Sequence, residues 1–173
     1  MLFSKMKTER KIILYIATSS DGFIARENGS VDWLEKYNDL EYDFGFNEFK
    51  ERFETVIVGN TTQKQYPNKY DGKTCYVFSR NPQDNIENLI YVSGDVKKFI
   101  EETNPIGNIW LVGGADLVNQ FIRYDLIDEL IITIMPEGIG NGILLFQEPD
   151  YMVKFKFVET KKFGEVVQLI YTK

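Results

Sequence analysis

Residues 109–121 constrain the fold more than any other stretch, because an apolar run leads through two glycines into a helical pattern. The run before Gly113 is continuous, which is typical of a strand covered on both faces. After Gly114, apolar residues recur at helical spacing. The free amides and dipole at the start of such a helix favour an anion, most commonly a dinucleotide pyrophosphate. Tight packing of a helix on a strand also selects small residues, so both interpretations stay open.

The composition limits the chemistry that the chain can perform. Its 173 residues fit one domain spanning residues 1–173. The absence of histidine removes Ser-His-Asp and Cys-His catalysis and argues against a zinc site, so we expect no metal. The single cysteine, Cys75, lies in a strand-like run and is expected to be a buried, unreactive thiol. Acid–base chemistry is left to carboxylates, tyrosine, lysine or water.

The sequence also indicates the cellular location of the protein and which classes of partner are disfavoured. Residues 1–7 lack the apolar core and cleavage site of a signal peptide, and no run approaches membrane-spanning length. We therefore expect a cytoplasmic protein that does not enter membranes. A net charge of −6 disfavours nucleic acid as a partner.

Strand and helix patterns alternate along the chain without a linker or repeat, which predicts an α/β fold with a mostly parallel central sheet. A turn is expected at Asp21-Gly22, and a capping box joins Asp32 to Glu35 at the start of a helix. Ser93 is the expected N-cap of a later helix. The other expected helices cover residues 47–53, 96–102 and the stretch after Gly114. The expected strands are residues 12–16, 55–59, 76–79, 89–92, 109–112, 130–135, 153–159 and 166–172, the last two forming an antiparallel hairpin.

Six motifs occur in an order that resembles the dihydrofolate reductase-like fold, and within it the reductase domain of the bifunctional riboflavin-biosynthesis deaminase-reductases. The resemblance covers the chain from about Lys11 onward and implies helices on both faces of the sheet, without a deaminase half. The motifs are residues 17–25, 31–34, 56–62, 77–80, 109–117 and 126–130, followed by a proline-glycine-leucine-phenylalanine segment within residues 136–146.

The resemblance implies a reduced nicotinamide cofactor, NADPH or NADH, lying across the carboxyl ends of the central strands. That position suits an open α/β sheet, because loops diverge and helix N-termini converge there. The residues that it assigns to the cofactor are Ala17, Ile24, Gly59, Asn60, Thr61, Thr62, Ser79, Arg80, Gly113, Gly114, Ala115, Asp116 and Leu117.

One position departs from the family pattern. Where this family usually has an arginine that helps bind the cofactor's phosphates, the chain has Asn60. Arg80 is the best candidate for a 2′-phosphate, because a guanidinium donates bidentately to phosphate, and Lys64 is a second cation in reach. The side chain of Asp116 is expected to point aside, since it would repel a phosphate. A lost preference for NADPH and a degenerate site without activity remain open.

The substrate end carries fewer signals. Ala17, Ile24 and Trp33 are candidates to line a nicotinamide and substrate pocket, with ordinary core packing as the alternative. Asp43 is the candidate catalytic carboxylate, by analogy with the carboxylate that pairs with the pterin in dihydrofolate reductases. If Asp43 is buried among its aromatic neighbours, its pKa rises and it can orient a substrate or relay a proton. The alternative is that it belongs to a solvated acidic face.

Two functions are compatible with these residues. The first is a stand-alone NAD(P)H-dependent reductase that transfers a hydride to a pterin-like or pyrimidine-like heterocycle. The second is a non-catalytic nucleotide or small-molecule binding protein on the same fold. A homodimer is expected from the family, and the sequence adds an apolar stretch that such an interface would use. That stretch comprises Ile139, Ile143, Leu144, Leu145, Phe146, Val153, Phe155 and Phe157.

Overall fold

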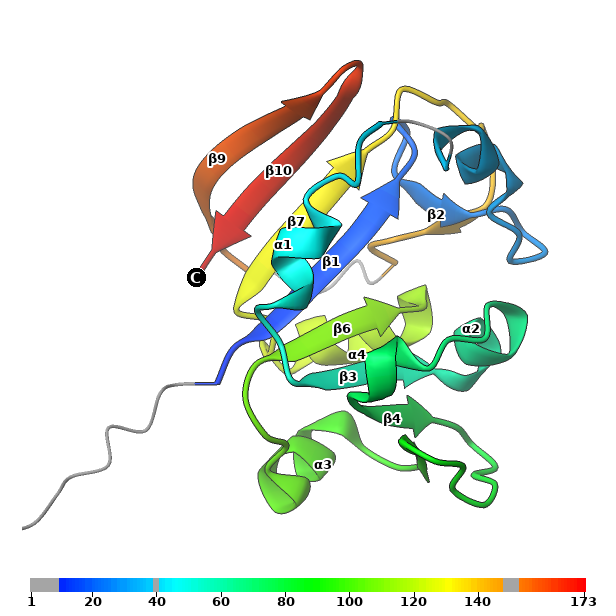
Figure 1. Cartoon of the computed structure of the whole chain (residues 1–173), viewed down its shortest axis with the longest axis vertical. Helices are drawn as coiled ribbons and strands as arrows, with labels where there is room; N and C mark the ends of the chain where they lie inside the picture. Colours follow the sequence, from blue (N-terminus) through cyan, green and yellow to red (C-terminus); the bar gives the residue numbers. More distant parts are fainter. Residues whose placement is uncertain (1–9, 39–40, 148–152) are drawn as a thin grey trace, which may run out of the picture.

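An eight-stranded sheet runs through the computed structural model, which describes residues 10–38, 41–147 and 153–173 (Figure 1). Its strands lie side by side in the order β5 (Leu89–Val92), β4 (Thr74–Phe78), β3 (Thr55–Gly59), β6 (Ile109–Gly113), β1 (Ile12–Thr18), β7 (Glu129–Ile134), β10 (Val166–Thr172) and β9 (Lys156–Phe163). The strands from β5 to β7 pair in parallel, and β10 pairs antiparallel with both β7 and β9. The predicted mostly parallel sheet with a C-terminal antiparallel hairpin is therefore confirmed.

Helices cover both faces of this sheet and make a three-layer fold. On one face, α3 (Val96–Thr103) and α4 (Ala115–Arg123) bury apolar residues against alternate positions of β1, β3 and β6. On the other face, α1 (Phe46–Lys50) and the 3-10 turn η2 (Tyr70–Gly72) pack on the positions between them. The central strands are thus buried on both sides, which explains why they read as continuous apolar runs.

A second, two-stranded sheet lies beside the carboxyl end of β1. It pairs β2 (Phe23–Ala25) antiparallel with β8 (Ile143–Leu144). Gly142 has a φ of +148°, and a Cβ there would lie 2.2 Å from the Ala25 carbonyl oxygen, so only glycine fits. The Asp21 carboxylate holds the same two segments together by accepting hydrogen bonds from the Gly140 amide at 2.8 Å and the Ile139 amide at 3.2 Å. Asp21 therefore does more than form the predicted turn.

Several local predictions need correction. Asp32 begins η1 (Asp32–Tyr37), a 3-10 helix without a side-chain cap, because its carboxylate is taken by Arg26 and Ser30. The predicted capping box is therefore wrong. Asp95 caps α3 through the Lys98 amide, so the prediction of Ser93 as the cap is wrong too.

Helix and strand limits differ from expectation at several places, and β1, β4 and β7 are shifted or extended by one or two residues. The helix expected over residues 47–53 is only α1, and Phe53 instead packs in the core after the helix has ended. The strand expected to start at Val153 begins at Lys156. A short helix, α2 (Asn60–Gln65), follows β3 directly.

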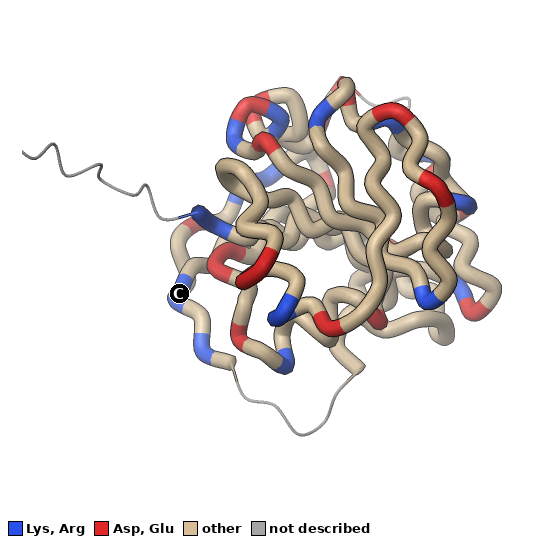
Figure 2. Tube along the Cα trace, turned by 90° about the horizontal axis from the view of Figure 1, so that it is seen from below, with Lys and Arg blue, Asp and Glu red and all other residues tan. Residues whose placement is uncertain are grey.

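Charged residues of both signs are interspersed along the outer loops and element ends, as the trace in Figure 2 shows. Exposed ion pairs such as Lys69–Glu87, at 2.9 Å, follow from this mixing. Within the described ranges, no helix is both long enough and apolar enough to cross a membrane.

Candidate cofactor and substrate cleft

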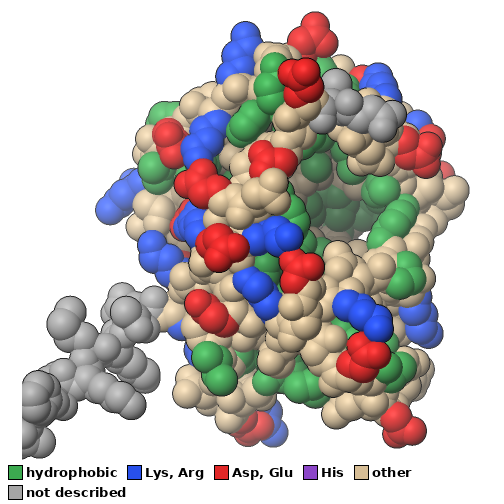
Figure 3. Space-filling view, in the orientation of Figure 1, with side chains coloured by type: hydrophobic (Ala, Val, Ile, Leu, Met, Phe, Trp, Pro, Cys, Tyr) green, Lys and Arg blue, Asp and Glu red, His purple; other side chains and the backbone are tan. Residues whose placement is uncertain are grey.

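A cleft of about 1010 Å³ opens at the carboxyl ends of β1, β3, β4 and β6. Figure 3 shows this hollow with hydrophobic side chains on its floor and charged side chains around parts of its rim. The structure brings most of the cofactor residues predicted from the sequence to this one cleft, although their role stays a prediction. Those in its lining are Ala17, Ile24, Gly59, Asn60, Thr61, Thr62, Ser79, Arg80, Gly114, Ala115, Asp116 and Leu117.

The two glycines form the turn between β6 and α4, and the peptide bond between them is cis. Gly113 has a φ of +122°, a conformation that favours glycine. A Cβ on Gly114 would come within 3.3 Å of Thr62 Oγ1, so a larger side chain there would project into the cleft region. Gly114 is also the N-cap of α4 and supplies no side-chain cap, which leaves the first-turn amides of α4 open to an anion. This cradle fits a pyrophosphate.

The polar groups beside the turn supply further donors and acceptors. Asn60 Oδ1 is buried and has no hydrogen-bond partner in the described parts of the chain. A buried polar atom without a partner is costly, so Asn60 is a natural contact for a bound ligand. Lys64 and Arg80 are the cations in the cleft lining. The Arg80 side chain is 94% exposed and lies 4.0 Å from the carboxylate of Asp116, which is 85% exposed.

At the β1 end, a buried polar network supports the cleft wall. Tyr15 lines the cleft, and its hydroxyl donates to the Phe44 carbonyl at 2.6 Å. The Gln168 amide donates to the same carbonyl at 3.0 Å and to Thr133 Oγ1 at 2.9 Å. Burial raises the pKa of Tyr15 to about 12, so Tyr15 is a neutral phenol at physiological pH.

The structure places two predicted substrate residues away from the cleft lining. The carboxylate of Asp43 accepts from the amides of Gly45 at 2.9 Å and Asn47 at 3.0 Å, at the start of α1. Asp43 is exposed and these hydrogen bonds lower its pKa, so the burial that would have raised the pKa is absent. Trp33 is 6% exposed and packs with Met135 and Val166 in a small core cluster. This packing matches the core-packing alternative, and a role for Trp33 in the substrate pocket stays a prediction.

Other cleft residues were not identified from the sequence. They are Tyr15, Ile16, Ala25, Gly29, Val31, Leu34, Lys64, Gln65, Tyr66, Phe78, Asn81, Gly94, Val112, Gln120, Ile143 and Gln147, of which only Lys64 was considered. Tyr15 and Val112 could have been found, because each stands on the same strand face as a neighbouring cleft position. Ile143 could not, because nothing in the sequence indicates that β8 pairs with β2. Across the described residues, no group of three or more acidic, cysteine or histidine side chains could hold a metal ion.

Comparison with known proteins identifies the family of the chain. The sequence pattern of the RibD C-terminal domain matches residues 95–169. The uncharacterized protein YwjB of Bacillus subtilis (strain 168) is 41% identical over 177 residues, covering 95% of this chain and 99% of YwjB. The chain belongs to the RibD C-terminal domain family.

Solved structures place this RibD C-terminal, reductase-like domain in the dihydrofolate reductase-like fold. A candidate riboflavin biosynthesis protein from Shewanella sp. PV-4 is 26% identical, with a TM-score of 0.82 over 94% of this chain and 98% of that one. Dihydrofolate reductase from Enterococcus faecalis, solved with NADP(H) and RAB-propyl, is 18% identical, with a TM-score of 0.66 over 94% of this chain and 95% of that one. The predicted fold class and family resemblance are confirmed.

Proposed function

We propose that this chain is an NAD(P)H-dependent reductase that passes a hydride to a pterin-like or pyrimidine-like heterocycle. The observation that carries the proposal is the uncapped start of α4 behind the Gly113-Gly114 turn, inside a cleft large enough for a dinucleotide and a second flat ring. The first-turn amides would hold the pyrophosphate, and Asn60 Oδ1 would gain the partner that it lacks. When bound, the nicotinamide supplies the hydride.

The chain's own residues would bind and orient rather than react. Ala17 and Ile24 give the cleft apolar walls at the β1 end, where a flat ring can lie and water is excluded. Arg80 and Lys64 are the cations available for a 2′-phosphate, so we propose NADPH as the preferred cofactor. NADH stays compatible, because Asn60 stands where the family usually has arginine.

A direct test is isothermal titration calorimetry with NADPH on the wild type and on Gly114→Val. The valine would put a branched side chain where the phosphate must approach, and should weaken binding at least tenfold, or about 1.4 kcal/mol. Gly114 has an ordinary φ of −69°, so the variant can fold, and circular dichroism checks that it does. Unchanged affinity in a folded variant would refute the pyrophosphate assignment.

A second candidate function, non-catalytic nucleotide binding, is favoured by one observation. Tyr15 is the titratable side chain among the described cleft residues on β1, and its proton is already donated to the Phe44 carbonyl. A phenol with a pKa of about 12 is a weak proton donor at neutral pH. NADPH oxidation, followed by absorbance with a panel of pteridines and pyrimidines, separates the two. Tight binding of NADPH without turnover of any acceptor would favour the binding protein.

We also propose a homodimer, formed through β9. Among the described residues this strand pairs only with β10, which leaves its outer edge without a partner strand there, and Phe157 and Val158 on it are 59% and 52% exposed. An open edge with exposed apolar side chains is a surface that a second copy can cover. Leu145, Val153 and Phe155 of the apolar stretch pack into or against the chain's own core instead, so they are not available to an interface.

A further inference from the structure

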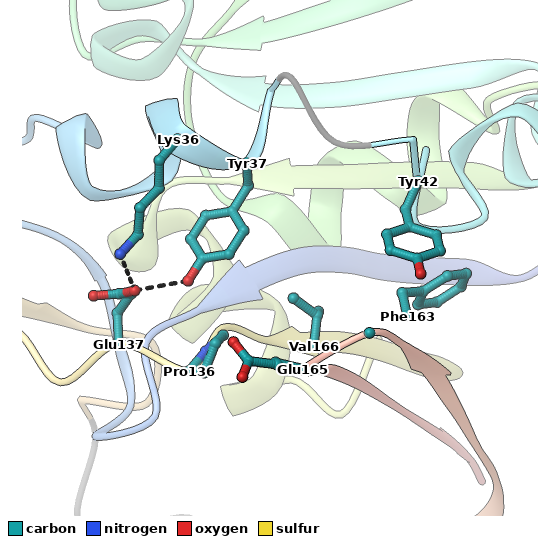
Figure 4. Close-up of a pocket in the computed structure, with 9 residues that line it drawn as sticks. Lys36, Tyr37, Tyr42, Pro136, Glu137, Phe163, Glu165 and Val166 are labelled. Atoms are coloured by element: carbon teal, nitrogen blue, oxygen red, sulfur yellow. Dashed lines mark hydrogen bonds and ion pairs between the residues drawn. The ribbon is translucent and has the colours of Figure 1, made fainter.

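A second cavity, of about 350 Å³, lies apart from the cleft and shares none of its lining residues. It is open to solvent and is bordered by η1, by the segment that follows β7, and by the turn between β9 and β10 (Figure 4). Val166, the first residue of β10, lines it and also packs with Trp33 in the small core cluster. Nothing in the proposed reductase reaction uses this cavity, so its chemistry has to be considered on its own.

One half of the cavity already holds a cation. The Glu137 carboxylate accepts a hydrogen bond from the Tyr37 hydroxyl at 2.7 Å and forms an ion pair with Lys36. The Lys36 ammonium also lies 5.4 Å from the centre of the Tyr37 ring. Figure 4 shows both side chains of η1 pointing toward this carboxylate. An aromatic face and a carboxylate together bind an ammonium here.

The rest of the cavity is lined by an aromatic pair and a second carboxylate. Tyr42 and Phe163 meet edge to face, with ring centres 6.0 Å apart, and both line the cavity. Glu165 lines it as well, and makes no hydrogen bond or ion pair with any residue that the structure describes. Two carboxylates therefore face one ammonium, and the cavity keeps a net negative charge.

The electrostatics of Tyr37 support the convergence of these groups. Burial raises the pKa of Tyr37 to about 12, and the nearby charges of Glu137 and Glu165 raise it in the same direction. The field of the Glu165 carboxylate thus reaches the Tyr37 hydroxyl, although the two residues come from opposite ends of the chain. A positively charged group placed between Glu137 and Glu165 would be attracted by both of their carboxylates.

We propose that this cavity binds a small organic cation that carries an aromatic ring, such as an arylalkylammonium. The ammonium would pair with Glu165, within reach of Glu137, and the ring would pack on Tyr42 and Phe163. The volume suits one ring with a short side chain, at the lower end of the range for ligand pockets, roughly 300–1,000 Å³. The site does not depend on whether the cleft binds a nucleotide.

The test is an NMR titration of the full-length ¹⁵N-labelled protein with 2-phenylethylammonium, 2-phenylethanol and 3-phenylpropanoate. We expect saturable shifts at the amides of Tyr37, Gly164 and Val166 with the cation, and at least tenfold weaker binding of the neutral and anionic probes. Equal binding of all three, no saturable binding of the cation, or shifts centred on Asn60 and Gly114 in the cleft would each overturn the proposal.

Substitutions at exposed positions identify the groups responsible. Glu165→Gln should weaken binding of the cation at least fivefold, whereas Glu159→Gln, an exposed carboxylate on β9 in the same hairpin, should leave it unchanged. Tyr42→Ala should also weaken binding, and Tyr42 is 45% exposed, so its loss does not open the core. Equal affinity in Glu165→Gln and wild type would overturn the assignment of the ammonium to that carboxylate.

Discussion

Replacing Gln168 with leucine tests whether the buried network behind the cleft stabilises the fold. Gln168 is 2% exposed, and its amide donates to Thr133 Oγ1 and to the Phe44 carbonyl. Thr133 is also 2% exposed, and its hydroxyl accepts from Gln168 beside the Tyr15 hydroxyl, with which it also interacts. Leucine preserves the approximate volume and removes both donors, so the cost comes from unsatisfied polar groups rather than from a cavity.

The two losses differ in size. The Phe44 carbonyl keeps the Tyr15 hydroxyl, so it loses one of two neutral hydrogen bonds, worth about 0.5–1.5 kcal/mol. The Thr133 hydroxyl loses the Gln168 donor inside the core, which costs about 1–3 kcal/mol. Gln168→Leu should therefore lower the free energy of unfolding by about 2–4 kcal/mol. For a chain of this length, that lowers Tm by roughly 5–15 °C.

Chemical denaturation followed by circular dichroism measures this loss, and a double-mutant cycle identifies its origin. Thr133→Val removes the hydroxyl that Gln168→Leu deprives of its donor, so the double variant should be more stable than the sum of the single effects predicts, by about 1–2 kcal/mol. A loss below about 0.5 kcal/mol for Gln168→Leu, or strict additivity in the cycle, would refute this reasoning.

Four further outcomes are expected. Arg80→Ala should weaken NADPH about tenfold in calorimetry and leave NADH nearly unchanged, because a guanidinium pairs with the 2′-phosphate that only NADPH carries; equal losses would show that Arg80 does not read this group. Cys75 is completely buried, and burial raises its pKa to about 12. A thiol reagent that labels the unfolded chain quickly should therefore not label the native protein at pH 8. Rapid labelling of the native protein would contradict the burial of Cys75. Phe157→Lys should shift the mass in light scattering from about twice 20.2 kDa to 20.2 kDa, and a monomeric wild type would reject the dimer itself. The pKa of Asp43 is lowered in the folded state, so its charged form stabilises the protein above the ordinary pKa of 3.8, and this stabilisation is lost as pH falls through the lower folded pKa. The difference in Tm between wild type and Asp43→Ala should therefore be present at pH 7 and shrink below pH 3.8. A difference that stays constant with pH would argue against capping by the carboxylate.

The central sheet could be predicted from sequence because its strands are buried on both faces, and such strands have continuous apolar sequences that can be recognised locally. The β-branched run of β3 and the apolar run of β6 are compatible with few structures other than a buried strand. The turn at Gly113-Gly114 was predictable for the same reason, since a strand pattern stops and a helix pattern starts within two residues.

The substrate end was less predictable because its geometry depends on contacts between distant segments. Asp32 has the spacing of a capping box, yet Arg26, six residues earlier, takes its carboxylate. Asp43 stands among aromatic residues, which suggests burial, but the nearby amides of α1 hold it at the surface. In the sequence Tyr15 looks like an ordinary strand residue. Its hydroxyl belongs to a network because the side chain of Gln168, on β10, donates to it in the folded structure. Such partners are 29 to 153 residues away from Tyr15 in the chain.

The position of β1 in the sheet also affects how the protein is made. β1 is synthesised before its partners β6 and β7, which follow about a hundred residues later, as the 97-residue separation of Lys11 and Asn108 shows. At a synthesis rate of roughly 5–20 residues per second, that delay lasts about 5–20 s. Ile13 and Leu14, completely buried in the finished sheet, have no strand to pair with during this time. During synthesis the nascent chain therefore exposes a short apolar β-segment to which a holding chaperone can bind. The central strand of the sheet is among the last to be paired.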